Sequence, residues 1–162
     1  MSSAPQTIVR RARREDLPAL GRLGASLLRE HYQIDPQRFI SPGDDPEGGY
    51  AWFLGTELSN PDVAVFVAER DATVVGYAYV GLEPQSWKDL REAAGYIHDV
   101  VVDPNARRHG VATALMDAGL AWLRERGAPR VVLTTAEQNE SAQRLFAKLG
   151  FRRTMIEMTR EL

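Results

Sequence analysis

The 162-residue sequence has no cysteine and only three histidines. Without cysteine the chain has no disulfide framework, no cysteine-ligated metal and no thiol nucleophile, which agrees with a reducing compartment. His31, His98 and His109 lie far apart in the sequence, and none belongs to the HExxH pattern of a zinc-binding helix. We therefore expect no metal cofactor.

Strong net charge and long apolar runs are also missing. The formal net charge is −2, which argues against a dedicated nucleic-acid binder because affinity for a polyanion comes from clustered cations. The basic cluster Arg10, Arg11, Arg13 and Arg14 is interpreted as a solvated face beside a strand and a helix start. No apolar run approaches the roughly 20 residues that cross a bilayer, and the N-terminus lacks a signal-peptide core. We expect a cytoplasmic protein that binds neither nucleic acid nor membrane.

The periodicity of apolar residues predicts one domain over residues 1–162, of which 1–6 form a flexible end. Turn-forming residues concentrated at 33–49 predict an exposed loop between the first two helices. The segments 63–70 and 74–83 predict an antiparallel hairpin, and a parallel strand, helix and strand unit should cover 96–137. Predicted helices are 17–32, 50–58, 111–126 and 139–149; predicted strands are 7–11, 63–70, 74–83, 96–102, 131–137 and 151–162.

The stretch 96–122 organises this pattern. A β-rich run containing Val100, Val101 and Val102 is followed by a turn with two arginines and Gly110, and then by helical periodicity. The free N–H groups of a helix N-terminus would thus lie at the end of a buried strand, where a phosphate can be held by backbone alone.

Two motifs in the sequence resemble those of one known family. Residues 107–112 read R-x-x-G-x-A after a V-x-V-x-P at 100–104, which resembles the acyl-CoA-binding motif of the GNAT superfamily. The later NESAQRLFAKLGF resembles the family's second signature, an Asn-initiated helix that ends in Leu-Gly-Phe. The element order also matches.

The resemblance implies a GNAT-like α/β fold of the α+β type, with a mixed sheet of about six to seven strands, about four flanking helices and a splay between the fourth and fifth strands. It implies an N-acetyltransferase that moves an acetyl group from acetyl-CoA to a primary amine, on a small molecule or peptide, by direct attack in a ternary complex. The acceptor is not identified by the sequence, and a homodimer is compatible with the family.

The resemblance assigns cofactor contacts to the strand, the turn and the last helix. The pantetheine arm would bond to the strand backbone, and the turn would hold the pyrophosphate. The expected cofactor-binding residues are Val100, Val101, Val102, Arg107, Arg108, His109, Gly110, Val111, Ala112, Thr113, Asn139 and Phe146.

The expected proton acceptor lies on the same strand, where relatives carry an acidic pair and this chain has His98 and Asp99. Histidine is largely neutral near pH 7 and can take a proton from the attacking amine, while Asp99 would orient the amine or support the loop. Glu92 and Glu137 are alternative bases. A purely structural role for His98 is weighted equally with its role as the base.

The proton donor departs from the family pattern, because Phe146 stands where a tyrosine is usual and has no proton to give. Tyr96, Tyr79 and Ser141 are substitutes that the sequence does not rank. This departure motivates an alternative function, a catalytically weak acyl-CoA-binding domain for regulation or interaction.

The family's acceptor site lies in the first two helices and the loop between them. The residues expected to contact the acceptor are His31, Tyr32, Phe39 and Trp52, where aromatics lie beside acids and suit a cationic amine.

Overall fold

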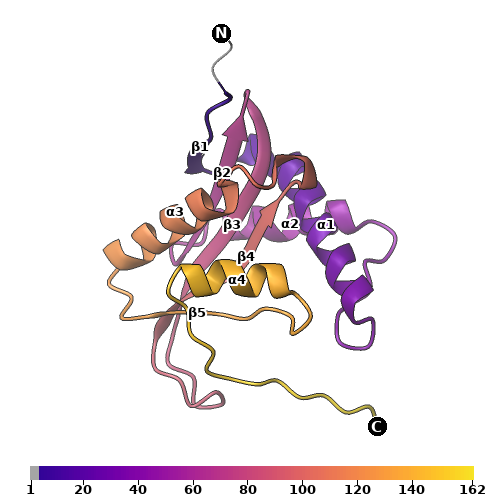
Figure 1. Cartoon of the computed structure of the whole chain (residues 1–162), viewed down its shortest axis with the longest axis vertical. Coiled ribbons are helices and arrows are strands. Elements are labelled where there is room, and N and C mark those ends of the chain that lie inside the picture. Colours follow the sequence, from indigo (N-terminus) through magenta and orange to yellow (C-terminus); the bar gives the residue numbers. More distant parts are fainter. Residues whose placement is uncertain (1–3) are drawn as a thin grey trace.

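The computed structural model describes residues 4–162 and shows one five-stranded sheet with helices on both faces (Figure 1). The strand order is β1-β2-β3-β4-β5, with antiparallel pairs up to β4 and a parallel β4–β5 pair, as predicted for the strand, helix and strand unit. The elements are β1 (Ile8–Arg11), η1 (Arg14–Asp16), α1 (Leu17–Ile34), α2 (Pro46–Glu57), β2 (Val63–Arg70), β3 (Thr73–Glu83), β4 (Ala94–Val102), η2 (Pro104–Ala106), α3 (Val111–Glu125), β5 (Val131–Leu133) and α4 (Glu140–Lys148). Within the described residues, no helix has both the length and the apolarity needed to span a membrane. Of the predicted flexible end at 1–6, residues 1–3 lie outside the described part, and 4–6 form neither helix nor strand.

Side chains alternate across the sheet and build two apolar layers. Toward α1 and α2 the layer includes Leu20, Leu54 and Tyr77, all fully buried. Toward α3 and α4 it includes Val80 and Met116, also fully buried. Figure 1 shows α3 and α4 crossing one face of the sheet, with α1 and α2 on the other. The site described below lies along the edge of β4 and on the sheet face toward α1 and α2.

Helix α3 carries a glycine where it contacts the sheet. A Cβ on Gly119 would lie 2.9 Å from the Cγ1 of Val80 on β3, closer than side chains tolerate. The glycine therefore fixes how near α3, and with it the turn at the helix N-terminus, comes to the central strands.

The predicted hairpin between β2 and β3 is present. Its strands are joined by Asp71 and Ala72, whose φ angles of 50° and 59° are left-handed. A two-residue turn of this hand matches the twist of the strands it connects.

Helix α2 begins before the segment 50–58 predicted from periodicity. Asp45 is its N-cap, and the Asp45 side chain accepts a hydrogen bond from the N–H of Gly48 at 2.9 Å. Pro46 occupies the first helical position, where its missing N–H costs nothing. The turn formers at the end of the predicted loop therefore start a helix.

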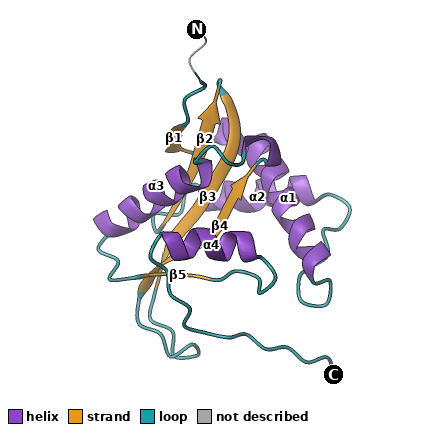
Figure 2. Ribbon diagram, viewed as in Figure 1, coloured by secondary structure: helices purple, strands orange, loops and turns teal. Residues whose placement is uncertain are grey.

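The predicted last strand does not form, so the described sheet has five strands and not six to seven. Residues 152–162 are exposed and have no strand pairing, and Figure 2 draws the chain after α4 as loop to its end. Met155, Ile156 and Met158 are at least 80% exposed. Arg38 donates to Glu157 with Nη2 3.0 Å from Oε2. The alternation of apolar and polar residues at 151–162 predicted a strand, but a strand also needs the edge of a neighbouring strand to pair with.

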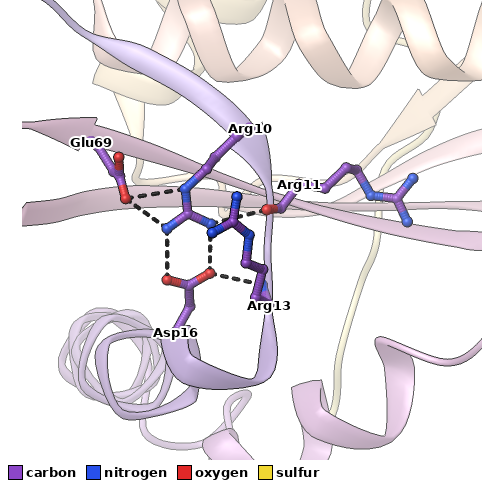
Figure 3. Close-up of polar contacts among 5 residues, drawn as sticks. All are labelled: Arg10, Arg11, Arg13, Asp16 and Glu69. Atoms are coloured by element: carbon purple, nitrogen blue, oxygen red, sulfur yellow. Dashed lines mark hydrogen bonds and ion pairs between the residues drawn. The ribbon is translucent and has the colours of Figure 1, made fainter. Parts of the chain in front are cut away.

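The first strand and the first helix are joined by an ionic network (Figure 3). The Arg10 guanidinium donates to both oxygens of Asp16 at 2.8 and 2.9 Å, and to Glu69 of β2 at 2.6 Å. Asp16, only 7% exposed, also accepts from the Arg13 N–H at 2.7 Å. Arg11 lies over the rings of Phe66 and Trp122. The basic cluster is thus not a uniformly solvated face, because Arg10 is committed to internal ion pairs.

Candidate active site

The parallel ladder between β4 and β5 is short. It joins Gly95 to Val131, Tyr96 to Val132 and Ile97 to Leu133, while β4 continues to Val102. Strand β5 is shorter than the predicted 131–137. Beyond Ile97 the edge of β4 that faces away from β3 has no strand partner among the described residues. Backbone groups from His98 to Val102 on that edge can therefore bond to an extended ligand.

The turn after β4 has the geometry of an anion cradle. Arg108 and Gly110 both have left-handed φ angles, 68° and 73°. The first helical bond of α3 runs from the Ala114 N–H to the Gly110 carbonyl at 3.0 Å, so the N–H groups of residues 111–113 precede it and have no partner inside the helix. A Cβ on Gly110 would meet no atom within 4 Å, which leaves open space for a phosphate. These residues fit the pyrophosphate of coenzyme A.

The other predicted cofactor residues have different surroundings. Arg108, His109 and Thr113 are exposed, Ala112 is partly exposed and Val111 is buried. Val100 and Val102 pack toward α3, whereas the side chain of Val101 lies in the opposite layer with α1 and α2. Only the backbone of Val101 is therefore available at the open edge.

A bulge in β4 brings the two predicted catalytic residues to one face. Tyr79 pairs with Asp99 and the next residue of β3, Val80, pairs with Ile97, so His98 is the additional residue. An inserted residue breaks the alternation of side chains, and His98 and Asp99 both point toward α2. Sequence alternation alone would have placed them on opposite faces.

The His98 ring lies between two tyrosines. It stacks on Tyr79 at 4.6 Å and on Tyr96 at 4.8 Å between centroids. Its Nε2 lies 3.2 Å from Oε1 of Glu83. A carboxylate only accepts hydrogen bonds, so in this contact Nε2 carries the hydrogen, and in the neutral ring the lone pair is on Nδ1. Glu83 thereby orients His98, a contact that the sequence pattern did not reveal.

Asp99 is held by two hydroxyl groups. Tyr50 of α2 and Tyr77 of β3 each donate to its Oδ2 at 2.9 Å. Burial of the carboxyl group raises the pKa of Asp99 above its ordinary 3.8, although the two hydrogen bonds oppose this shift. Burial and the neighbouring Asp99 also raise the pKa of Tyr50 and of Tyr77. The contacts of Tyr50 and Tyr77 with Asp99 were not predicted. The only related signal in the sequence was the period-two spacing of Tyr77 and Tyr79, which places both side chains on one face of β3.

The alternative bases lie elsewhere. Glu92 and Glu137 are exposed, and within residues 4–162 the hydrogen bonds and ion pairs of His98 and Asp99 involve neither of them. On α4, Phe146 is half-buried in the layer with α3 and meets Phe151 edge to face at 6.0 Å. Asn139 caps α4 as predicted, because its side chain accepts from the Ala142 N–H at 3.1 Å.

The four predicted acceptor residues do not form one cluster. His31 and Phe39 meet edge to face at 4.8 Å, and the Nδ1 of His31 lies 2.9 Å from the Leu27 carbonyl oxygen. Tyr32 lines a separate open hollow with Arg29 and residues 41–44. Trp52 is 73% exposed on α2. No contact joins Trp52 to the other three in the described structure.

Comparison with known proteins decides the family. The model of the Acetyltransferase (GNAT) family matches residues 26–151 of the sequence. The chain belongs to the GNAT family. The match includes α2, all of β4, the phosphate turn and α4, so both motifs found in the sequence lie inside it.

Two relatives show how far the likeness of this GNAT chain extends. It is 34% identical over 121 residues to a mycothiol acetyltransferase of Thermomonospora curvata, covering 71% of the chain and 38% of the relative. It is 35% identical over 97 residues to human N-acetyltransferase 8, covering 60% of the chain and 42% of the relative. The chain therefore spans well under half the length of these curated relatives.

Solved structures share the fold of this GNAT chain. An aminoglycoside N-acetyltransferase in complex with CoA superposes with a TM-score of 0.77 at 18% identity, over 100% of this chain and 98% of that one. A predicted acetyltransferase of Clostridium acetobutylicum with acetyl-CoA superposes with a TM-score of 0.68 at 21% identity, over 95% of this chain and 96% of that one. GNAT acetyltransferases use acetyl-CoA as their cosubstrate.

Proposed function

We propose that this chain transfers an acetyl group from acetyl-CoA to a primary amine by direct attack. One observation carries the proposal: β4 runs past the end of the β5 ladder with an open backbone edge, directly into the left-handed turn at Gly110. With its pyrophosphate bound at the turn, the cofactor would extend its pantetheine arm along that edge. The reacting end of the arm would then lie near the bulge that carries His98.

Acetyl-CoA supplies the acyl group as a thioester, and the chain's own groups hold and orient it. The N–H groups at the start of α3 and the guanidinium groups of Arg107 and Arg108 bind phosphate. The free N–H groups of β4 donate to the carbonyl oxygen, where negative charge develops during attack.

The Nδ1 atom of His98 accepts the proton of the amine, directly or through a water molecule. Glu83 fixes the ring by accepting from Nε2 at 3.2 Å, and the stacked rings of Tyr79 and Tyr96 restrict its rotation. A base with a fixed tautomer and a fixed plane presents its lone pair in one direction. Asp99 links α2 to the sheet instead, because Tyr50 of α2 and Tyr77 of β3 both donate to its Oδ2.

Tyr96 is the best-placed proton donor to the departing thiolate. The hydroxyl of Tyr79 is committed to Oε2 of Glu57 at 2.7 Å, and the residue is only 8% exposed. Tyr96 is partly exposed, and no partner of its hydroxyl exists among the described residues. Its ring lies one residue before the end of the β5 ladder. Ser141 is exposed at the start of α4 and is the alternative donor.

A second candidate function is acyl-CoA binding without useful catalysis. Phe146 supports it, because its ring contacts Phe151 at 6.0 Å and offers no proton to a leaving group. In this reading the turn and the open edge bind acyl-CoA, and the chain acts through a partner. Steady release of free thiol with any amine rejects this second function.

The first experiment measures cofactor binding. Acetyl-CoA at a hundred times its Kd should stabilise the chain by about 2.7 kcal/mol, which raises Tm by several degrees. Gly110→Glu should abolish the shift because its added carboxylate would lie where phosphate binds. Gly127→Glu is the matched control, since Gly127 has a similar left-handed φ of 80° and equal open space. The unaltered chain showing no shift overturns the proposal.

The second experiment measures turnover. Purified chain with acetyl-CoA and a panel of thiol-free primary amines, including an aminoglycoside, is assayed for free thiol. The aminoglycoside is included because a structural neighbour is an aminoglycoside N-acetyltransferase. Sustained thiol release with at least one amine is expected.

A further inference from the structure

The sheet face beside His98 carries a row of aromatic rings longer than proton removal requires. Phe53 of α2 meets Tyr79 of β3 edge to face at 5.8 Å between centroids. The row continues through His98 to Tyr96 on β4, with spacings of 4.6 and 4.8 Å. It therefore runs from α2 across the sheet to the place where β4 loses its β5 partner. The apolar surface of such rings favours an apolar stem.

Two carboxylates bracket this aromatic row and come from different elements. Glu57, the last residue of α2, accepts from the Tyr79 hydroxyl at 2.7 Å. Glu83, the last residue of β3, lies 3.2 Å from Nε2 of His98. Among residues 4–162 neither carboxylate has a lysine or arginine within ion-pair distance. Neither carboxylate is therefore neutralised by a lysine or arginine side chain.

Part of the row is accessible to a ligand. Tyr79 is buried, at 8% exposed, while Phe53 is 38% exposed. The side chains of His98 and Glu83 are 24% and 38% exposed. A ligand that reaches His98 therefore lies along rings with a carboxylate within reach.

We propose that the acceptor is a polycationic amine: a primary amine on an apolar stem that carries a second protonated nitrogen. The inference rests on the proposed function and names the acceptor class for that same site. The reacting nitrogen approaches Nδ1 of His98, the stem lies on the aromatic row, and the second nitrogen is held by Glu57 or Glu83. Attraction to a carboxylate that has no lysine or arginine partner favours the second protonated nitrogen. An acceptor with an anionic far end is repelled by the same groups.

The test compares acceptors that share one reacting end. Cadaverine, pentylamine, aminopentanol and aminovalerate each present a primary amine on a five-carbon chain, with a cationic, apolar, neutral polar or anionic far end. We expect kcat/KM for cadaverine to exceed that for pentylamine by about tenfold, a difference of about 1.4 kcal/mol. Aminovalerate should be the poorest acceptor, and added salt should reduce the ratio of cadaverine to pentylamine.

Two variants connect this preference to the carboxylates. Glu57→Gln and Glu83→Gln should each lower the ratio of cadaverine to pentylamine several-fold. Glu125→Gln, which removes an equal charge from an exposed position on α3, should leave the ratio unchanged. The ratio of two substrates is unaffected by loss of folded protein, so a poorly folding variant remains informative.

The outcomes separate the two proposals. Equal turnover of cadaverine and pentylamine overturns the polycationic acceptor and leaves the acetyltransferase function standing. A preference that survives in both glutamine variants also overturns it. If acetyl-CoA raises Tm but no amine releases thiol, the proposed function fails and the acceptor class fails with it.

Discussion

Glu30 of α1 holds the guanidinium of Arg107 at the phosphate turn, with Oε1 3.0 Å from Nη2. The Nε of Arg107 also lies 3.3 Å from the Val102 carbonyl oxygen and donates to it. Arg107 therefore bridges α1 and the end of the open β4 edge. It is engaged by the chain's own acceptors at the place where we expect the cofactor's phosphates and arm.

Glu30→Gln should strengthen binding of CoA. Removing the charge frees Arg107 for phosphate and removes a carboxylate from the site, so we expect Kd to fall about threefold, in line with the few tenths to 1 kcal/mol of an exposed ion pair. Arg107→Gln should weaken binding. Calorimetric titration with CoA measures both, and Asp62→Asn is the control because it breaks another exposed pair, with Arg126. Unchanged Kd in both Glu30 and Arg107 variants contradicts an Arg107–phosphate contact.

His98→Ala should lower kcat/KM about a hundredfold with good acceptors, the ordinary contribution of a positioned base. The Tm shift with acetyl-CoA should persist, since the histidine side chain lies on the α2 face and the turn is intact. The measurement is turnover across a pH series. The base assignment is wrong if the variant keeps the pH dependence of the unaltered chain.

Tyr96→Phe should lower kcat about tenfold or more without weakening cofactor binding, because the ring and its stacking on His98 remain while the proton donor is lost. Phe146→Tyr in the same chain should restore part of the rate by supplying a hydroxyl from α4. Ser141→Ala is the comparison. A loss of turnover in Ser141→Ala and none in Tyr96→Phe would transfer the donor role to the serine.

Asp99→Asn should stabilise the chain increasingly as pH rises. Burial raises the pKa of Asp99 above 3.8 in the folded chain. A carboxyl with a raised folded pKa supports folding when protonated, so its contribution is complete below pH 3.8 and is lost as pH rises through the raised pKa. The asparagine side chain does not titrate, so the stability of the variant does not decrease in this way as pH rises. Urea unfolding of both proteins from acid to neutral pH measures the difference, and a difference independent of pH would contradict the prediction.

Asp16→Asn should show the opposite pH dependence. Hydrogen bonds from Arg10 lower the pKa of Asp16 below 3.8, so its contribution to stability is present above pH 3.8 and is lost as pH falls through the lowered pKa. At neutral pH we expect a loss of about 2 kcal/mol, because the hydrogen bonds involve charged groups. Asp117→Asn, at an exposed position on α3, should cost little. An equal loss for Asp16→Asn at acid and neutral pH would argue against the ion pair.

The local parts of the fold could be predicted because their causes are local. The four helices, the hairpin and the parallel unit follow from apolar periodicity and turn residues. Asn139 was expected to cap α4, and it does. The early start of α2 was missed although its signal, Asp45 followed by Pro46, is in the sequence. The prediction of a last strand was wrong, because a strand forms only where another strand offers an edge to pair with. A local sequence pattern does not show whether such an edge is available.

The sequence by itself determined the cofactor half of the candidate site, because a strand, a glycine turn and a helix N-terminus occupy consecutive residues from Val100 to Thr113. Only the tertiary structure decided the other half. Glu83 reaches His98, and Tyr50 and Tyr77 reach Asp99, through a bulge in β4 and contacts between residues far apart in the chain. The bulge reverses which face a side chain takes, and it is set by the pairing of β4 with β3. The acceptor side is therefore a property of the packed sheet.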